Sequence, residues 1–248
     1  MPFVLVSQGL AGALLLPLAV VGGLRLPDFA KRWPTIALMF ALYAVGHVLY
    51  ATALRTVEAS VFSTLLRTST AWVVATGYIV FDEKVRALDI AGTALVLLSI
   101  LLLVEWGGEQ RADQGVARGL AVGAVFGLAS SAWVSVGREA DLVTWTAVSF
   151  LGTPALLALV RRRAVPAAAS LLARDGGAMV PLAVFAAASN LASLAAFQRG
   201  PASLIAPVQA TGVVVTAIIA IIFLGERRRV PQKVGAAVVS CVGVVLVT

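Results

Sequence analysis

The sequence predicts an all-α membrane protein, a nine-helix transmembrane bundle built from an inverted-topology repeat. Three observations support this prediction. The chain is unusually apolar, its apolar residues fall into nine segments long enough to cross a bilayer, and its two ends match one another at a fixed offset. A duplicated block of membrane helices is typical of secondary transporters, so the same pattern bears on function.

Composition places the chain among membrane proteins. Apolar residues make up 60% of the 248 residues and charged residues only 12%, about half the charged share of a soluble domain. A core alone cannot hide so much apolar surface, so we expect the lipid bilayer to cover much of it in a multi-pass protein of the plasma membrane. The net charge of +7 does not indicate a nucleic-acid partner, because the basic residues lie in short loops, where Lys and Arg set membrane topology.

A helix needs about 20 apolar residues to cross the hydrocarbon core. Nine segments satisfy this requirement, and charged residues and turn formers fill the breaks between them. The longest break, Arg161–Ala178, contains the alanine-rich stretch Ala167–Ala173, for which we expect a separate short helix at the membrane surface. The predicted spans are Phe3–Leu24, Pro34–Leu54, Ala59–Phe81, Leu88–Trp106, Val116–Gly137, Leu142–Val160, Met179–Gln198, Ala202–Leu224 and Pro231–Thr248.

The chain repeats itself at an offset of 143 positions, so that residues 41–104 align without a gap on residues 184–247. His47 falls on Asn190 and Glu83 falls on Glu226. Identical residues also coincide at five further places: Ala53 on Ala196, Ala59-Ser60 on Ala202-Ser203, Thr68 on Thr211, Arg86 on Arg229, and Gly92 on Gly235.

The offset also predicts the direction of the repeats. It maps each span onto the fifth span after it, and because five is odd the two copies cross the membrane in opposite senses. We therefore expect a first repeat at 1–110 with four helices and a second at 115–248 with five. Span five has no counterpart, since its equivalent falls before Met1. We expect a bundle that lacks the first of ten helices, through a missing helix or a start codon placed downstream of the true one.

Paired motifs mark the ends of equivalent spans. In the second repeat they read Gly200-Pro201-Ala202-Ser203, Leu224-Gly225-Glu226-Arg227 and Val234-Gly235. In the first repeat they read Glu58-Ala59-Ser60, Asp82-Glu83-Lys84 and Ala91-Gly92.

These motifs resemble the EamA family of the drug/metabolite transporter superfamily, in which a helix beginning near a Pro-Ala-Ser step runs to a Gly-Glu and the next helix opens with a Gly. The segment Ser130–Trp133 also resembles the helix that opens a repeat in that family, whereas Asp82 stands where the family usually has Gly. The resemblance covers nearly the whole chain. It implies ten helices, a pseudo-twofold axis in the membrane plane, and export or import of small metabolites.

Arg67 is the most informative polar residue within a span, because burying an unpaired charge in lipid is costly. It lies about eight residues, or ~12 Å, into the third span, and it shares a helical face with Ser63 and Thr70. One interpretation is a fixed positive charge that attracts an anionic substrate group such as a carboxylate. The alternative is an arginine that reaches the interface or pairs with Glu58.

A second group of polar residues occupies equivalent depths in the two repeats. His47 and Tyr50 share a face of span two with Tyr43, and Asn190 and Ser193 occupy the positions of His47 and Tyr50 in span seven. We expect them near the axis that relates the repeats, where they would hydrogen-bond a small-molecule substrate, with His47 also able to take up a proton. The alternative is interhelical hydrogen bonding that stabilises the bundle.

Two further candidates for substrate binding are Gln209, on a polar face of span eight, and Trp72, near the middle of span three. Trp72 could stack on an aromatic or cationic substrate, or simply pack against helices or lipid. On span nine, Ala236, Ser240 and Gly243 form a small-residue face suited to close packing within the bundle or in a homodimer.

The sequence argues against catalysis. It contains no phosphate-binding Gly-x-x-x-x-Gly-Lys loop, no His/Cys/Asp cluster with metal-ligand spacing and no recognisable nucleophile and base, so we expect no enzyme, no cofactor and no metal. The leading hypothesis is a secondary transporter of small metabolites, amino-acid-like or amphipathic, that works by alternating access. The alternative is a non-transporting membrane protein, either a truncated or degenerate family member or a partner subunit.

Overall fold

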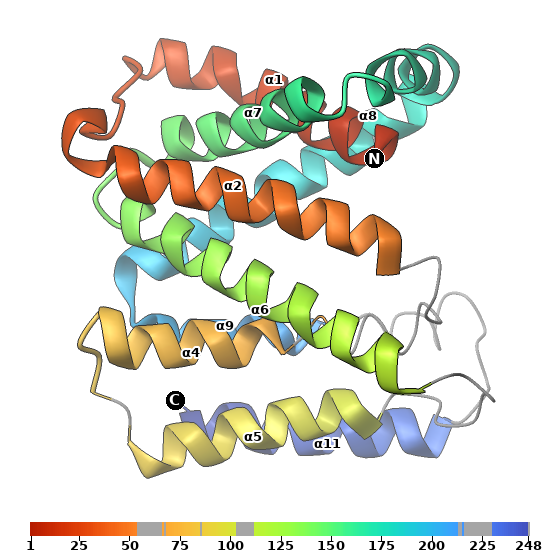
Figure 1. The fold of residues 1–248 in the computed structure, drawn as a ribbon. Coiled ribbons are helices and arrows are strands. Elements are labelled where there is room, and N and C mark those ends of the chain that lie inside the picture. The colour runs from red at the N-terminus through yellow and green to blue at the C-terminus, as the bar shows by residue number, and fades with distance from the viewer. Residues whose placement is uncertain are drawn as a thin grey trace. The chain divides into compact units, whose positions relative to one another are not determined.

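The computed structural model describes residues 1–53, 66, 68–84, 86–102, 112–212, 215 and 230–247. These residues are almost entirely helical and contain no β-strand, which confirms the all-α fold class (Figure 1). The helices are α1 (Pro2–Val21), α2 (Phe29–Ala53), α4 (Ser69–Val80), α5 (Ala87–Leu102), α6 (Ala112–Gly137), α7 (Leu142–Val160), α8 (Ala164–Arg199), α9 (Ala202–Ala210) and α11 (Val230–Val247).

Five of the helices in the described part of the chain are long and apolar enough to cross a membrane, namely α1, α2, the 117–137 part of α6, α7 and α8. The protein is therefore a multi-pass integral membrane protein. The predicted span Leu142–Val160 coincides with α7, because Asp141 caps the helix: its Oδ1 accepts a hydrogen bond from the Thr144 backbone N–H at 2.8 Å.

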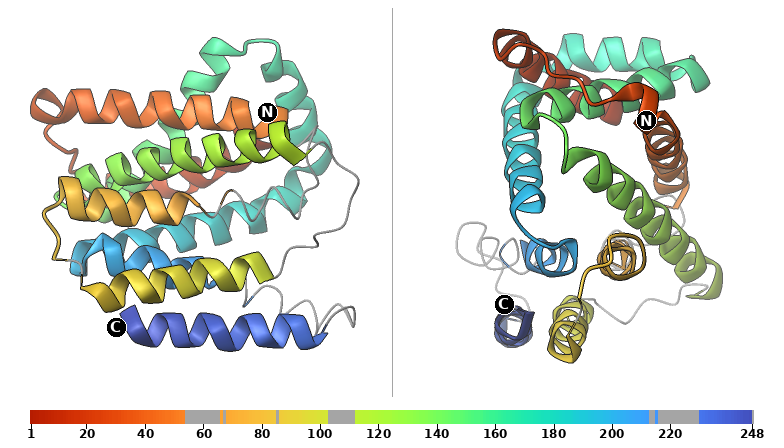
Figure 2. Two further views of the ribbon diagram at one scale, coloured as in Figure 1. Left: turned by 60° about the horizontal axis from the view of Figure 1, so that its bottom comes forward. Right: turned by 90° about the vertical axis from the view of Figure 1, so that its left-hand side faces the viewer.

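Residues 167–173, for which a short helix was expected, are helical but form part of a longer helix. Helix α8 begins at Ala164 and continues without a break through Gly176, Gly177 and Pro181 to Arg199. Alanine has the highest helix propensity, so the alanine-rich stretch extends the helix instead of forming a unit of its own. The 36 residues make a helix of about 54 Å, longer than the ~30 Å hydrocarbon core. Figure 2 shows that α8 changes direction along its length, as expected for a helix with a proline inside it.

The chain folds into two compact units, and neither unit corresponds to a sequence repeat. The first contains residues 1–51 and 129–199, and the second contains residues 52–128 and 200–248. Each unit takes helices from both repeats. Helices α1 and α2 share the first unit with α7 and α8, and helices α4 and α5 share the second unit with α9 and α11.

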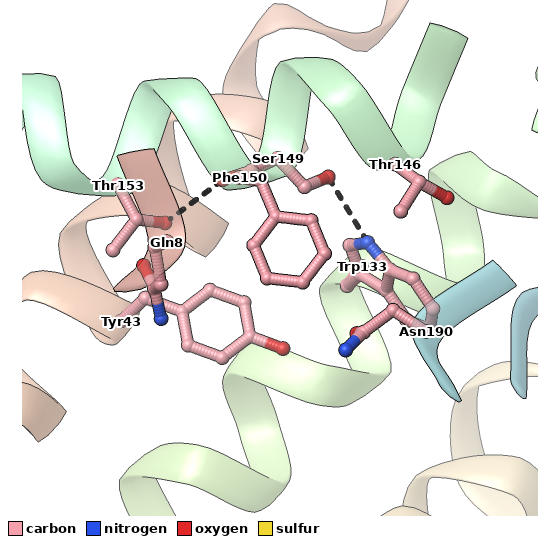
Figure 3. Close-up of a pocket in the computed structure, with 8 residues that line it drawn as sticks. All are labelled: Gln8, Tyr43, Trp133, Thr146, Ser149, Phe150, Thr153 and Asn190. Carbon is pink, nitrogen blue, oxygen red and sulfur yellow. Dashed lines mark hydrogen bonds between the residues drawn. The ribbon is translucent and has the colours of Figure 1, made fainter. Parts of the chain in front are cut away.

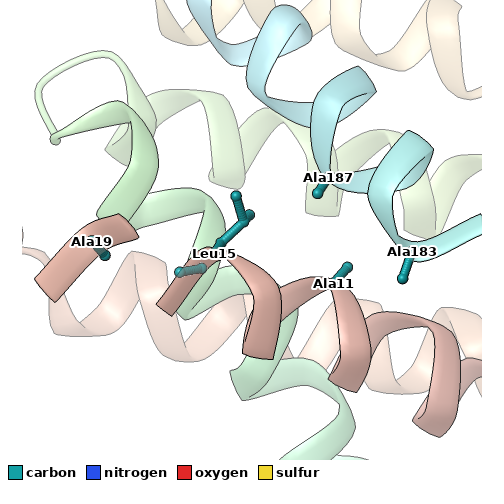
Figure 4. Close-up of a cluster of buried hydrophobic side chains, with 6 residues drawn as sticks. Ala11, Leu15, Ala19, Ala183 and Ala187 are labelled. Atoms are coloured by element: carbon teal, nitrogen blue, oxygen red, sulfur yellow. The ribbon is translucent and has the colours of Figure 1, made fainter. Parts of the chain in front are cut away.

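In the first unit, α1 packs against its repeat counterpart α7 and against α8. The contact is made mostly by alanines, whose small side chains let the helix backbones approach closely (Figure 4). Figure 1 shows α1 and α7 running in opposite directions. The buried cluster consists of Ala11, Leu15, Ala19, Ala147, Ala183 and Ala187.

In the second unit, α5 packs against its counterpart α11, and the two helices are antiparallel. Gln232, at the start of α11, donates a hydrogen bond to the carbonyl oxygen of Leu102, at the end of α5. Farther along, Gly243 lies against Gly92. Because α5 and α11 are equivalent in sequence, their antiparallel contact is what an inverted-topology repeat requires.

The small-residue face of α11 is used within this unit. Ala236 and Ser240 are buried, and Gly243 lies close to the Gly92 carbonyl oxygen. The opposite face of α11 exposes Val234, Val238 and Val242, which are suited to contact with lipid.

Candidate functional site

A cavity of about 120 Å³ lies within the first unit (Figure 3). It is formed by α1 and α2 of the first repeat together with α6, α7 and α8 of the second, so both repeats contribute to its wall. The described residues that line it are Gln8, Tyr43, Trp133, Thr146, Ser149, Phe150, Thr153 and Asn190.

Helix α7 supplies half of this lining. Thr146, Ser149, Phe150 and Thr153 follow the spacing i, i+3, i+4, i+7 and therefore share one face of the helix. The three hydroxyls donate to main-chain carbonyl oxygens of the preceding turn, at Leu142, Trp145 and Ser149, over 2.7, 2.7 and 3.2 Å respectively. Their protons are thus occupied within α7, and their oxygens can act as acceptors, as Ser149 Oγ does for Trp133.

Trp133 is fixed by contacts on two sides. Its Nε1–H donates to Ser149 Oγ at 3.0 Å, and its ring meets Phe197 edge to face, with centroids 6.4 Å apart. The buried Trp145 supports this arrangement, because its own Nε1–H donates to the Trp133 carbonyl oxygen at 3.1 Å. The indole of Trp133 therefore forms a rigid wall of the cavity.

On α2, Tyr43 is held by two neighbours. Its hydroxyl lies 3.4 Å from Ser130 Oγ, and its ring lies nearly parallel to the His47 ring, with centroids 6.5 Å apart. Together with Trp133 and Phe150, Tyr43 gives the cavity three aromatic side chains (Figure 3).

Gln8 is the polar residue that α1 contributes. Its Nε2 lies 3.1 Å from His47 Nε2, so the amide N–H donates to the unprotonated ring nitrogen. The other amide atom, Oε1, is buried and has no hydrogen-bond partner. A buried acceptor without a donor costs about 1–3 kcal/mol. Gln8 therefore lines the cavity while its buried Oε1 stays without a partner.

Of the residues predicted to bind substrate, Asn190 lines this cavity, where its Nδ2 donates to the Ala186 carbonyl oxygen at 3.0 Å. His47 lies behind the cavity wall, one hydrogen bond away through Gln8. Tyr50 and Ser193 are half-buried on the same helices as His47 and Asn190, but neither is among the lining residues.

The remaining predicted residues lie elsewhere. Trp72 and Gln209 belong to the second unit, where Trp72 is 43% exposed and Gln209 is exposed on α9. The Trp72 side chain packs close to Gly127 of α6, which leaves no room there for a Cβ atom. Arg67 lies outside the described residues, so the structure does not bear on its predicted role.

Sequence reasoning missed most of the lining residues. The three hydroxyl residues of α7 recur at helical spacing within an apolar span, which is a usable signal for a polar face. Gln8 interrupts a long apolar run, and Trp133 belongs to the segment Ser130–Trp133, which indicates a family but no role for the indole. In the described part of the chain, no group of three or more His, Cys, Asp or Glu side chains is placed to hold a metal ion.

Comparison with known proteins supports the repeat organisation. The sequence model of the EamA-like transporter family matches residues 1–105 and residues 115–248, which together make up nearly the whole chain. No curated protein matches the chain. A protein of known crystal structure is similar at 19% identity, with a TM-score of 0.74 over 100% of this chain and 87% of its own, which shows a shared fold.

Proposed function

The chain belongs to the EamA-like transporter family and is a membrane transporter, and we propose that it moves a small metabolite by alternating access around the cavity between Gln8 and Asn190. The observation that carries this proposal is the composition of the cavity wall. Two helices of one repeat and three helices of the other surround a space lined by polar and aromatic side chains, inside a unit of mainly apolar helices.

This arrangement supports transport because the helices that form the wall come from repeats of opposite direction. In inverted-repeat transporters the substrate site lies where the two copies meet, and one copy moves against the other to expose the site to alternate sides of the membrane. A small shift of α1 and α2 relative to α7 would change access to the cavity while leaving each helix intact.

We further propose that transport is secondary, driven by a gradient or by exchange, because the sequence carries no phosphate-binding loop for ATP. The proposed substrates are small metabolites, either amino-acid-like or amphipathic. Their direction of movement, export or import, follows from the gradient to which transport is coupled.

The test is counterflow in proteoliposomes. Purified protein is reconstituted into vesicles that are loaded with a mixture of unlabelled small metabolites, and entry of labelled metabolites is followed. We expect Asn190→Leu to reduce the rate of entry about tenfold or more, because it replaces a polar lining group with an apolar one of similar size. The matched control is Ser189→Ala on the exposed side of the same helix, which should leave the rate unchanged.

Two outcomes would contradict the proposal. Equal entry rates for the wild type and Asn190→Leu would mean that substrate does not pass through this cavity. Absence of counterflow for every metabolite, in protein that is folded and correctly inserted, would favour the non-transporting alternative.

The hypothesis about Arg67 is tested in the same assay. If its charge attracts an anionic group of the substrate, Arg67→Ala should abolish entry of anionic metabolites and Arg67→Lys should retain part of it. Entry that is unchanged in Arg67→Ala would defeat this hypothesis without bearing on the cavity.

A further inference from the structure

Helix α8 has more residues than one crossing of the membrane requires. A crossing takes about 20 residues, and the sequence predicts this span at residues 179–198. The preceding residues, 164–178, belong to the same helix. Figure 2 shows the start of α8 running in a different direction from the rest of the helix, and Pro181 lies where the predicted span begins. The start of α8 can therefore lie along the membrane surface while the rest of the helix crosses.

This start of α8 exposes an apolar side. Val165, Ala169 and Leu172 follow the spacing i, i+4, i+7 and so share one face of the helix. All three are exposed, although two of them are large apolar residues. Ala168 is buried, so the helix packs against the protein with a neighbouring side. The apolar side is left for the acyl chains of the bilayer.

The opposite side of the same stretch is basic. Arg174 follows Val165 by about two and a half helical turns, so the two side chains leave the helix in opposite directions. The Arg174 side chain is 77% exposed and pairs with Asp175 over 2.8 Å. A helix with an apolar side opposite a cationic one is typical of segments that lie in the membrane interface.

More positive charge lies in the turn that precedes α8. Arg161, Arg162 and Arg163 are consecutive and exposed, and none of them forms an ion pair within the described part of the chain. With Arg174 and Asp175 included, residues 161–178 contain four arginines and one aspartate, a net charge of +3. Basic residues that cluster beside a membrane helix attract anionic lipid headgroups. The headgroup layer can thus supply the negative charge that the described residues do not.

We propose that residues 161–178 form a binding site for anionic phospholipids. The arginines contact the lipid phosphates, and the side formed by Val165, Ala169 and Leu172 enters the apolar layer beneath them. The site is separate from the cavity, because no residue that lines the cavity belongs to this segment. The inference concerns the bilayer and does not depend on the proposed transport.

Quenching of a dye by brominated lipid tests the placement of the segment. Cys241→Ala removes the native thiol of the full chain, and bimane is attached at Ala169→Cys on the apolar side or at Ala167→Cys on the basic side. Both chains are placed in nanodiscs of phosphatidylcholine that carries bromine on its acyl chains. We expect the dye at position 169 to be quenched about twofold more than the dye at position 167. Equal quenching would show that the segment does not lie in the interface and would overturn the proposal.

The dye at position 169 also reports which lipid gathers beside it. Nanodiscs of unbrominated phosphatidylcholine receive a small fraction of brominated lipid, either phosphatidylglycerol or phosphatidylcholine. At low salt we expect phosphatidylglycerol to be concentrated about fivefold over phosphatidylcholine, because several arginines attract it. High salt screens exposed charges, so it should reduce this preference toward onefold.

Charge variants locate the preference. Changing Arg161, Arg162 and Arg163 to glutamine should reduce it to about onefold, whereas changing the same residues to lysine keeps the charge and should keep most of it. The matched control removes three exposed basic residues from other parts of the chain and should retain the full preference. Its changes are Lys31→Gln, Lys84→Gln and Arg199→Gln.

The proposal is overturned if the two lipids quench equally at low salt, which is the result expected for arginines that only set topology. It is also overturned if the preference survives in the glutamine variant, or if the matched control loses it as well. Should the glutamine variant fail to fold, the salt series on the chain with its arginines intact decides, and a preference that does not respond to salt refutes the site. Counterflow is a separate measurement, so failure of transport would leave this inference standing.

Discussion

Gly243 of α11 lies against the main-chain carbonyl oxygen of Gly92 in α5, so closely that a Cβ atom at position 243 would come within 2.7 Å of that oxygen. The two helices are counterparts at the offset of 143. They meet in an antiparallel arrangement because each repeat crosses the membrane in the opposite direction. Glycine lets the backbones approach, and van der Waals contact at such short range is a main source of helix association in membranes.

The first prediction concerns this contact. Gly243→Ala should lower the free energy of unfolding by about 1–3 kcal/mol, because the atom that the new Cβ meets belongs to the backbone and cannot rotate away. Gly235→Ala is the control on the same helix, since a Cβ at Gly235 meets nothing within 4 Å. Thermal unfolding in detergent measures both variants. Equal melting temperatures for the two would contradict the proposed role of Gly243.

The second prediction concerns Glu83, whose carboxylate accepts hydrogen bonds from the backbone N–H groups of Ala202 and Ser203, at 2.8 and 2.9 Å. This contact caps the start of α9 with a negative charge, where the helix dipole favours it. Glu83→Ala should cost about 1–2 kcal/mol of stability, and Glu83→Gln about half as much because one acceptor remains. Amide hydrogen exchange at Ala202 and Ser203 should accelerate in both variants. Unchanged exchange at these two amides would show that the cap does not act in the protein.

The third prediction concerns Asp82, which has a φ of +53°. This left-handed conformation is open to glycine and costly for other residues. The left-handed conformation gives a physical reason why the EamA family usually has glycine at this position. Asp82→Gly should raise the free energy of unfolding by about 1 kcal/mol. Lys84→Gly, two residues away and without a positive φ, should instead lower it by about 0.5 kcal/mol. The idea fails if Asp82→Gly is no more stable than Lys84→Gly.

Features of the structure that depend on residues close together in the sequence could be predicted, whereas features that depend on contacts between distant helices could not. The limits of α7 were predicted correctly because they depend on local signals: an apolar run preceded by Asp141 and followed by Arg161. The inverted repeat was predicted correctly because a duplication leaves its offset in the sequence. The continuity of α8 was missed because Arg161–Ala178 was interpreted as a break between spans, whereas the alanines in it favour helix.

The cavity was harder to predict because its geometry depends on which helix faces meet. Gln8 and His47 are 39 positions apart, and no spacing rule states that α1 places one against the other. Trp72 was selected for its depth within a span and Gln209 for its place on a polar helix face, but neither criterion specifies the compact unit to which a residue belongs. The units interleave the two repeats, so helices far apart in sequence form one site.

The fourth prediction is a pH dependence at Asp141. Burial alone would raise the pKa of this carboxyl, but hydrogen bonds from Thr144 and the nearby charge of Arg25 outweigh it, and the pKa lies below its ordinary value of 3.8. A carboxyl with a lowered pKa in the folded state stabilises the protein fully above the unfolded-state pKa, and this contribution is lost as the pH falls through the lower, folded-state pKa.

Asp141→Asn keeps a capping oxygen but does not ionise. The stability difference between wild type and this variant should therefore be constant from pH 7 to about pH 5 and shrink below about pH 4. Chemical unfolding across this range measures the difference. A difference that grows as the pH falls would mean that folding raises the pKa of Asp141 instead of lowering it.

The last prediction is the membrane orientation, where two arguments disagree. Each loop is numbered by the predicted span that it follows. The odd-numbered loops contain seven Lys and Arg residues and the even-numbered loops contain eleven. The positive-inside rule therefore places the even-numbered loops, and the N-terminus, in the cytoplasm. The family arrangement places odd loops there. In the structure, odd-numbered loops contact one another within each unit. Arg32 pairs with Glu139 in the first unit, and Glu83 caps α9 at Ala202 in the second.

We expect the family arrangement, with the C-terminus in the cytoplasm, because the excess on even loops is modest and because Arg25, Lys31 and Arg32 flank the earliest hairpin, which usually dominates insertion. Green fluorescent protein fused after Thr248 should fluoresce, since it folds in the cytoplasm, and alkaline phosphatase at the same site should be inactive. Inserting one additional transmembrane helix before the reporter should reverse both signals. An active phosphatase in the direct fusion would place the C-terminus outside and would show that the summed loop charges, not the first hairpin, determine the orientation.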